Sequence, residues 1–222
     1  VFGIKKEKVL PIEINEAWQT RDAKKLDRLV RYNREDAETT LRLAQEFLPL
    51  FIEISRLTSL TLAYSTRAST SVMVEDLLLK EISKRGIIAP NKPYEPLIRE
   101  RLNNPIKGAF VKEPLAGLHE NITVLDFASL YPSIIISHNI SPETLNCKHK
   151  DCKKNMSPDG TWFCQKEKGL FPEILEKMLS QRLEFKKEYK EKKKEGIDDK
   201  ILFAKQWALK IILNSTYGYL GY

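Results

Sequence analysis

The sequence has few cysteines, no long apolar run and no internal repeat, and these absences exclude several classes of protein. Its three cysteines all lie between Cys147 and Cys164, so a disulfide framework for the whole chain is excluded. No apolar stretch approaches the roughly 18 residues that a membrane span needs. The opening residues, VFGIKKEKVLPIE, do not have the pattern of a signal peptide. We therefore expect a cytoplasmic protein with no membrane partner.

What is present is an ordinary globular composition with an uneven charge distribution. Hydrophobic residues make up 42% and charged residues 30% of the 222 residues, which excludes a collagen-like or mainly disordered chain. The length suits one large domain or two small ones. The net charge is +7, and residues 201–222 contain two lysines and no acidic residue. A positive helix flanked by aromatic residues favours phosphate or nucleobase as its partner.

The first two thirds of the chain predict helices and one buried strand. Apolar residues recur at steps of three and four over residues 24–56, which predicts an amphipathic helix with Pro49 near a bend. Residues 77–82 predict a second helix that Gly86 ends. Residues 122–127 read as a buried strand. Pro132 then fits the first turn of a further helix.

The last third predicts a helical hairpin. Residues 172–195 form a strongly charged helical pattern, and residues 201–217 resume one after a short turn. The turn offers a glycine stop and acidic N-cap candidates. Two antiparallel helices are therefore expected.

Asp126 is the first candidate for chemistry. It closes the predicted strand and is followed by FASLYPSII, so its carboxylate should lie beside the backbone amides that open the next helix. Hard divalent cations prefer carboxylate and carbonyl oxygens, and free N–H groups at a helix start attract phosphate. The alternative is that Asp126 only caps the helix.

The hairpin carries the second candidate site. Arg182 and Lys186 are four residues apart on one helical face, and Lys210, Asn214 and Tyr217 share a face of the second helix. If the helices are antiparallel, the three cations can converge on a triphosphate. The alternative is a solvated face in which glutamates balance the lysines.

Two longer motifs carry a family resemblance. DFASLYPSII and KIILNSTYG resemble the motifs DxxSLYPSII and KxxxNSxYG of family B DNA polymerases, in the same order. YNREDAETT resembles the third exonuclease motif, YxxxD, of the proofreading domain. STRASTSVMVE, APNKP and GAFVKEPLAGLHENITVLDF are similar to the linking region of the archaeal branch. The resemblance spans essentially the whole chain.

This resemblance implies a mixed α/β, helix-rich fold. It assigns residues 1–56 to the end of an RNase H-like 3′-5′ exonuclease domain and residues 57–170 to a linker and the N-terminal part of the palm, with a partial palm sheet. Residues 171–222 would be the antiparallel two-helix fingers hairpin. The implied partners are primer-template DNA, a deoxyribonucleoside triphosphate, and further segments: an N-terminal exonuclease segment and a C-terminal palm and thumb segment.

The resemblance also gives roles to residues around the first motif. Asp126 matches the first catalytic aspartate of the palm, which bridges two Mg²⁺ ions, and the carbonyl of Phe127 is a further metal ligand. Ser129 and Leu130 match positions whose amides touch the triphosphate. Tyr131 matches the residue that packs under the deoxyribose and excludes a 2′-hydroxyl group.

On the hairpin, the resemblance implies a nucleotide site. Arg182, Lys186 and Lys210 match the cations of the fingers. Asn214 and Tyr217 match positions beside the nascent base pair.

The exonuclease motif is represented in part. Asp36 resembles a metal-binding carboxylate, and Tyr32 resembles the residue that positions the attacking water. The first two exonuclease motifs and the palm motif of the YGDTDS type, with its second aspartate, do not occur in the sequence. The YxGG/A signature reads Ile106-Lys107-Gly108-Ala109, without its aromatic residue.

The cysteines leave three interpretations open. Cys147, His149, Cys152 and Cys164 could complete a tetrahedral zinc site, although CxHxxC followed by a lone cysteine is not a standard pattern. The resemblance to archaeal relatives implies a disulfide between Cys152 and Cys164. Free thiols are the third interpretation.

The functional expectation is a portion of a DNA-directed DNA polymerase. The parent enzyme would add deoxyribonucleotides to a primer 3′ end by a two-metal mechanism, with 3′-5′ proofreading. The alternative is a non-catalytic subunit, or a truncated piece of a split polymerase, that only contributes nucleotide- and DNA-binding surface.

Overall fold

The computed structural model describes residues 8–89, 91, 93–104 and 110–220, and the regular secondary structure within these ranges is helical. The segment from Ile106 to Ala109, where an aromatic residue is missing from the family signature, lies outside the described residues. The α-helices and the two 3₁₀ turns run in this order: α1 Pro11–Thr20, α2 Ala23–Thr58, α3 Leu62–Ser65, α4 Thr70–Lys84, α5 Glu95–Asn103, α6 Leu130–Ser137, η1 Pro142–Thr144, η2 Lys150–Asn155, α7 Leu170–Lys194 and α8 Lys200–Leu220.

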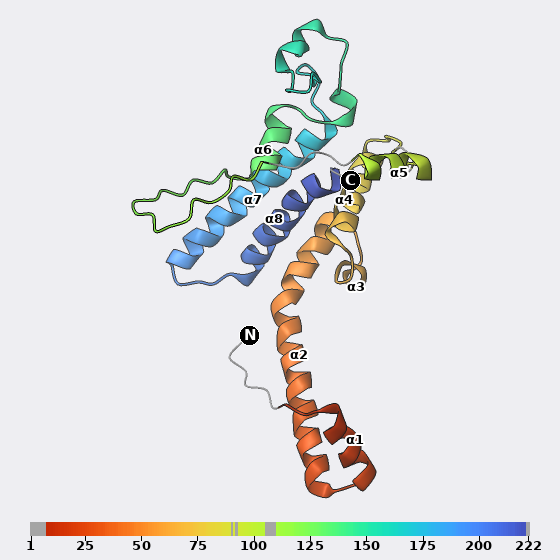
Figure 1. The fold of residues 1–222 in the computed structure, drawn as a ribbon, viewed down its shortest axis with the longest axis vertical. Coiled ribbons are helices and arrows are strands. Elements are labelled where there is room, and N and C mark those ends of the chain that lie inside the picture. The colour runs from red at the N-terminus through yellow and green to blue at the C-terminus, as the bar shows by residue number, and fades with distance from the viewer. Residues whose placement is uncertain (1–7, 90, 92, 105–109, 221–222) are drawn as a thin grey trace.

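The long helix α2 confirms the helix predicted over residues 24–56. The Asp22 carboxylate caps its first turn, accepting hydrogen bonds from the N–H groups of Lys24 at 2.9 Å and Lys25 at 3.0 Å. Pro49 lies inside the helix, which ends at Thr58 and is followed by Ser59 with a φ of 79°. In Figure 1, α2 (orange) runs from the helical core to α1 at its far end.

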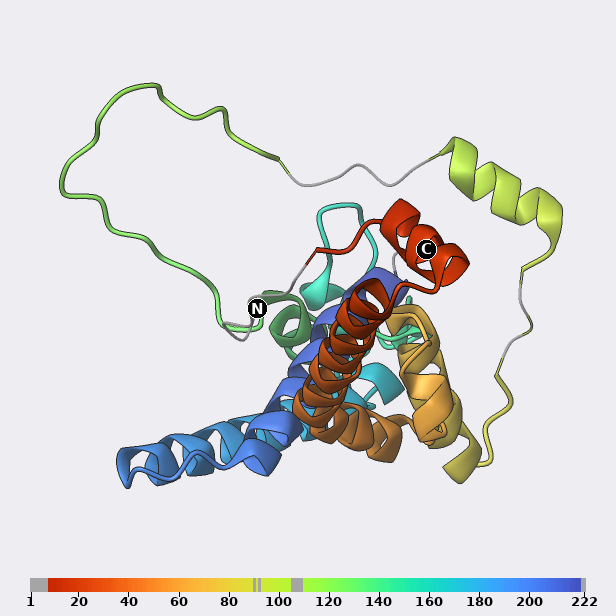
Figure 2. The same ribbon diagram turned by 90° about the horizontal axis from the view of Figure 1, so that it is seen from below.

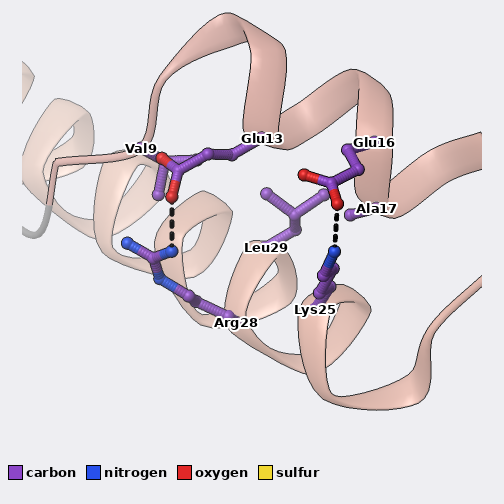
Figure 3. A pocket seen from close by; sticks show the side chains of 7 residues that line it. All are labelled: Val9, Glu13, Glu16, Ala17, Lys25, Arg28 and Leu29. Atoms are coloured by element: carbon purple, nitrogen blue, oxygen red, sulfur yellow. Dashed lines mark hydrogen bonds and ion pairs between the residues drawn. The ribbon is translucent and has the colours of Figure 1, made fainter. Parts of the chain in front are cut away.

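Helix α1 folds back on the first turns of α2 through ion pairs. Glu13 pairs with Arg28 at 2.8 Å, and Glu16 pairs with Lys25. Figure 3 shows these acids of α1 facing the bases of α2 across a small cavity. The apolar residues that line the cavity are Val9, Ala17 and Leu29. All four charged side chains are substantially exposed, so these pairs are weak and salt-sensitive, whereas Ala17 of α1 is buried.

One apolar core joins five helices. Helix α8 packs against α2, α4, α6 and α7, which places it at the centre of the bundle. The buried side chains at its centre include Ile54 of α2, Val74 of α4, Leu175 of α7 and Leu209 and Ile212 of α8. This core holds the start of α6 against the helical hairpin.

The predicted hairpin is confirmed as α7 and α8. Gly196 takes a φ of 82° in the turn, and Asp199 Oδ1 accepts a hydrogen bond from the N–H of Leu202 at 3.0 Å, which caps α8. Lys192 of α7 pairs with Asp199 at 2.9 Å. Further along, the ammonium of Lys205 lies 5.3 Å from the ring centre of Phe185, as an antiparallel pair requires. Helix α6 begins at Leu130, so Pro132 lies in its first turn, as predicted.

The mixed α/β fold class is wrong for this structure. Neither the partial palm sheet nor an RNase H-like sheet is seen, because the described ranges contain two isolated bridges and no strand. Residues 122–127, predicted as a buried strand, are an exposed extended segment in which Val124 is 87% and Leu125 90% exposed. In Figure 2 the chain before α6 forms a wide arc away from the helices.

The physical reason is that a strand is stable only beside another strand. Its backbone N–H and C=O groups need partners, and its apolar face needs a cover. None of the residues that the structure describes supplies either to residues 122–127. Although the residue pattern of this segment favours a strand, the segment stays unpaired because no described strand lies beside it.

The predicted division at residues 56 and 170 stays a prediction. The first boundary falls within α2, two residues before that helix ends, and helices from all three predicted parts contribute to the core. Among the described helices, none combines the length and apolar character required to cross a bilayer. The cytoplasmic location stays a prediction.

Candidate nucleotide and metal site

The start of α6 faces α7, and one hydrogen bond joins them. Ser129 precedes the helix in the left-handed conformation, with a φ of 53°. Its side chain does not cap the first turn, and its hydroxyl oxygen instead accepts a hydrogen bond from Arg182 Nη1 at 3.4 Å. Two residues that the sequence placed in one nucleotide site, 53 positions apart, are thus brought together.

Not all hydrogen-bond donors of the Arg182 guanidinium group have an acceptor among the described residues. Its Nε–H is buried and has no acceptor among the described residues. Leaving a buried donor of a charged group unpaired is unfavourable, so this position favours an anionic oxygen as its partner. Ser129, which accepts the hydrogen bond from Arg182, directly precedes the uncapped first turn of α6 that begins at Leu130.

Two tyrosines form a second contact of the same site. The rings of Tyr131 on α6 and Tyr217 on α8 stack with their centroids 3.8 Å apart and their planes 10° apart. Both remain more than 40% exposed. Each ring therefore keeps one face for another flat or apolar group.

For the other three hairpin candidates, Lys186, Lys210 and Asn214, the structure records no side-chain hydrogen bond or ring contact with Ser129, Tyr131 or Arg182 among the described residues. Lys186 on α7 and Asn214 on α8 are exposed. The ammonium of Lys210 lies 4.2 Å from the ring centre of Trp207, one turn earlier on the same helix. Convergence of Lys186 and Lys210 with Arg182 stays a prediction.

Asp126 and Phe127 lie just before this site. Both are exposed, and neither belongs to a strand. The carboxylate of Asp126 and the carbonyl of Phe127 are hard oxygen donors of the kind that Mg²⁺ prefers. The described residues bring no group of three His, Cys or acidic ligands together around Asp126. The described residues therefore offer two donor groups at this position for a metal ion, one carboxylate and one carbonyl.

The exonuclease candidates occupy a different part of the molecule. Tyr32 and Asp36 are one turn apart on α2 and both are half-buried, so they share a helical face. At 1.5 Å per residue, Asp36 lies about 27 Å along the helix from the core residue Ile54. Asp36 therefore lies well away from the apolar core that contains Ile54.

The four Cys and His candidates do come together. The ligand atoms of Cys147, His149, Cys152 and Cys164 all lie within 4.8 Å of one another, and such a group could hold a metal ion. All three cysteines are free thiols in the structure. The sequence spacing did not predict this cluster with certainty, because Cys164 is far along the chain from the other three residues.

The thiols of this cluster differ in acidity. Burial raises the pKa of Cys147 above its ordinary value. Burial also opposes ionisation of Cys164, but hydrogen bonds from the backbone N–H groups of Glu167 and Lys166, and from His149, outweigh it and lower the pKa of Cys164 to about 7. Part of the Cys164 population is therefore thiolate at neutral pH.

Sequence reasoning missed Asn139, which holds this region to the end of α6. Its side-chain amide donates to the carbonyls of Cys164 at 2.5 Å and Glu167 at 2.7 Å, and its oxygen accepts from the N–H of Gly169 at 2.8 Å. Asn139 is also left-handed, with a φ of 55°. An asparagine directly after a helix is the only sequence signal for this role.

Replacing Asn139 with alanine is expected to loosen the segment between α6 and α7. The loss leaves the carbonyl of Glu167 and the N–H of Gly169 without these partners, while the carbonyl of Cys164 keeps the side-chain amide of Gln165 at 3.2 Å, and we expect a cost of about 3 kcal/mol of local stability. Hydrogen exchange of the amides over residues 144–164 should accelerate by about 10²-fold. Asn33→Ala, on the exposed surface of α2, is the control and should leave that exchange unchanged. Equal exchange in the two variants would contradict the role of Asn139.

Comparison with known proteins identifies the family. The model of "DNA polymerase family B" matches residues 59–222. DNA polymerase 1 of Pyrococcus abyssi is 44% identical over 224 residues, covering 100% of this chain and 28% of that protein. The DNA polymerase of Thermococcus gorgonarius is 43% identical over 225 residues, with the same two coverages. The chain therefore belongs to DNA polymerase family B, as the motifs around Asp126 and Asn214 indicated.

A solved structure agrees with this assignment. The family B DNA polymerase from the hyperthermophilic archaeon Pyrobaculum calidifontis is similar with a TM-score of 0.77 and 33% sequence identity. The match covers 100% of this chain and 29% of that protein. The chain thus spans under a third of the length of the relatives it matches.

Proposed function

We propose that the full-length protein carrying this chain is a DNA-directed DNA polymerase. It adds deoxyribonucleotides to the 3′ end of a primer paired with a template strand, and it carries a 3′-5′ proofreading activity to which Tyr32 and Asp36 contribute. Family membership supports the reaction class. The nucleotide site is inferred from the buried Nε–H of Arg182, which has no acceptor among the described residues, and from the bond of Arg182 to Ser129 at the uncapped start of α6.

The chain's own residues would bind and orient the triphosphate. Arg182 donates to a phosphate oxygen that replaces the missing acceptor, and the amides of Ser129 and Leu130 donate to the same group. Lys186 and Lys210 add positive charge from the exposed hairpin. This arrangement stabilises the negative charge on the transferring phosphoryl group without any movement of the backbone of α6.

The tyrosines would define the sugar and base positions. The free face of Tyr131 packs against the deoxyribose, and Tyr217 and Asn214 lie beside the base. Because the two tyrosine rings stack on each other, Tyr217 supports Tyr131 from behind. A supported ring cannot move aside for a 2′-hydroxyl group, so the pair favours deoxyribonucleotides.

Asp126 and the carbonyl of Phe127 fit Mg²⁺ by their chemistry. This ion is usually held by one or two carboxylates together with water and substrate phosphates, so two protein donors are a sufficient contribution. Bound there, Mg²⁺ supplies positive charge at the reacting phosphate. Further carboxylates are expected from segments of the full-length protein outside this chain.

Substitution of Arg182 tests the nucleotide site. In primer extension by the full-length protein, Arg182→Ala should lower kcat/KM for the nucleotide by about 10²- to 10³-fold, the usual effect of losing one preorganised contact to the transition state. Lys194→Ala, which removes an exposed cation at the far end of the same helix, is the control.

Two outcomes would count against the proposal. If Arg182→Ala and Lys194→Ala extend primers equally well, Arg182 does not contact the triphosphate. If the unmodified protein binds primer-template DNA but extends no primer with any nucleotide, the protein is a non-catalytic binding component.

A further inference from the structure

The segment between α6 and α7 folds almost without an apolar core. Within residues 141–169, all of which the structure describes, the buried apolar side chains are Cys152 and Cys164 alone. Leu145 and Met156 are about half exposed. Figure 1 shows the segment (teal) as a lobe at the top of the view, beyond the core helices. A lobe of roughly thirty residues with so little apolar burial usually needs a metal ion or a disulfide to stay folded.

Backbone pairing brings two of the four candidate ligands together. The N–H of Asn146 donates to the carbonyl of Trp162 at 2.8 Å, and the N–H of Cys164 donates to the carbonyl of Thr144 at 2.8 Å. The indole N–H of Trp162 donates to the carbonyl of Cys147 at 3.0 Å. These bonds hold Cys147 and Cys164 on adjacent, antiparallel pieces of chain.

The other two ligands come from the turn that follows. Cys152 lies in η2, where its N–H donates to the carbonyl of His149 at 3.1 Å. The Nδ1 atom of His149 lies 3.4 Å from Sγ of Cys164. All four ligand atoms are within 4.8 Å of one another. In a tetrahedral site with Zn–S bonds of about 2.3 Å, neighbouring sulfurs are about 3.8 Å apart, so a small movement of the side chains completes the site.

One backbone N–H group is directed at a sulfur atom of the cluster. The N–H of Gln165 donates to Sγ of Cys152 at 3.3 Å. Such a donor stabilises a thiolate that binds a metal and orients it toward the metal. The sulfur of a disulfide carries no charge and gains little from an N–H donor. This contact therefore favours metal binding over a bond between Cys152 and Cys164.

We propose that Cys147, His149, Cys152 and Cys164 bind one Zn²⁺ ion as a closed structural site. Three thiolates and one imidazole in a tetrahedral arrangement are a ligand set typical of zinc, and they leave no open position for chemistry. The loaded site would have a net charge of −1, and residues 141–169 contain six lysines against four acidic residues.

The ion would affect the candidate nucleotide site only by fixing how helices α6 and α7 lie relative to each other. Residues 141–169 connect the end of α6 to the start of α7, and the same two helices carry Ser129 and Arg182 at their contact. A lobe held by zinc fixes where α7 begins relative to α6. The proposal does not depend on the polymerase assignment, because its readout is metal content.

Metal analysis of the full-length protein tests the site. Protein purified under reducing conditions, without chelator, should contain about one zinc per chain beyond any zinc bound elsewhere, and Cys147→Ser or Cys164→Ser should remove about one equivalent. Cobalt(II) in place of zinc should give the intense visible absorption of tetrahedral thiolate coordination. His119→Gln, which changes an exposed histidine outside this segment, should keep the full equivalent.

Three results would overturn the proposal. One is a native protein in which Cys152 and Cys164 are oxidised to a disulfide, seen as a mass two hydrogens lower before reduction. Another is equal zinc content in the unmodified protein and both serine variants. The third is a cobalt spectrum of the unmodified protein without thiolate bands, and this measurement decides the matter even if the serine variants do not fold.

Discussion

Asp126→Ala in the full-length protein is expected to abolish primer extension, with a fall of at least about 10³-fold in the incorporation rate. Under the proposed function, Asp126 holds the positive charge that the reacting phosphate needs. In the described part of the chain, Asp126 belongs to no group of three or more acidic, Cys or His residues that could hold the ion in its place. Primer extension at saturating nucleotide and Mg²⁺ measures the effect.

The fold should survive this substitution. Asp126 is exposed and lies outside the helical core, so the thermal unfolding midpoint of the variant should match that of the unmodified protein. Asp27→Ala is the matched control, because Asp27 is an exposed carboxylate whose ion pair with Arg31, at 3.3 Å, contributes little. Retention of a tenth of the normal incorporation by Asp126→Ala would exclude a role as metal ligand.

The parts of the fold that were predicted correctly are those that local sequence determines. Helices α7 and α8 follow from their periodicity, and the turn between them follows from Gly196 and the capping carboxylate of Asp199. Pro132 at the start of α6 is a signal of the same kind. Each of these features depends on residues within one or two helical turns.

The predicted strand failed for the opposite reason. The apolar pattern over residues 122–127 indicates a segment that needs a partner strand, but it does not provide one. Its side chains, such as Val124 and Leu125, are therefore exposed in this structure. We expect this segment to pair only where a longer chain supplies neighbouring strands.

The sequence predicted which residues belong to the candidate site, but it did not predict which of them contact one another. Spacing along each helix placed Arg182 and Tyr217 on plausible faces. It could not show that Arg182 donates to Ser129 or that Tyr217 stacks on Tyr131, because both contacts depend on how α6 packs against the hairpin. The family motifs supplied that proximity before the structure did. Asn139 was not predicted, because the hydrogen-bond partners of its side chain lie at least 25 residues further along the chain.

The stacked tyrosines lead to the second large effect. Tyr131→Val in the full-length protein should raise incorporation of ribonucleotides relative to deoxyribonucleotides by about 10- to 200-fold, the range expected when a pocket gains the space of a small group. Under the proposed function the ring of Tyr131 packs under C2′ of the sugar and is held there by Tyr217, 3.8 Å away. Valine has no ring to fill that space, so the 2′-oxygen can enter.

The matched variant Tyr131→Phe separates the ring from its hydroxyl group. Phenylalanine keeps the aromatic face and its stacking on Tyr217, so discrimination between the two nucleotides should remain as in the unmodified protein. The measurement is the ratio of kcat/KM for each nucleotide and its ribo counterpart in single-nucleotide extension. If Tyr131→Val and Tyr131→Phe discriminate equally well, Tyr131 packs against Tyr217 without touching the sugar, and another residue must exclude the 2′-hydroxyl group.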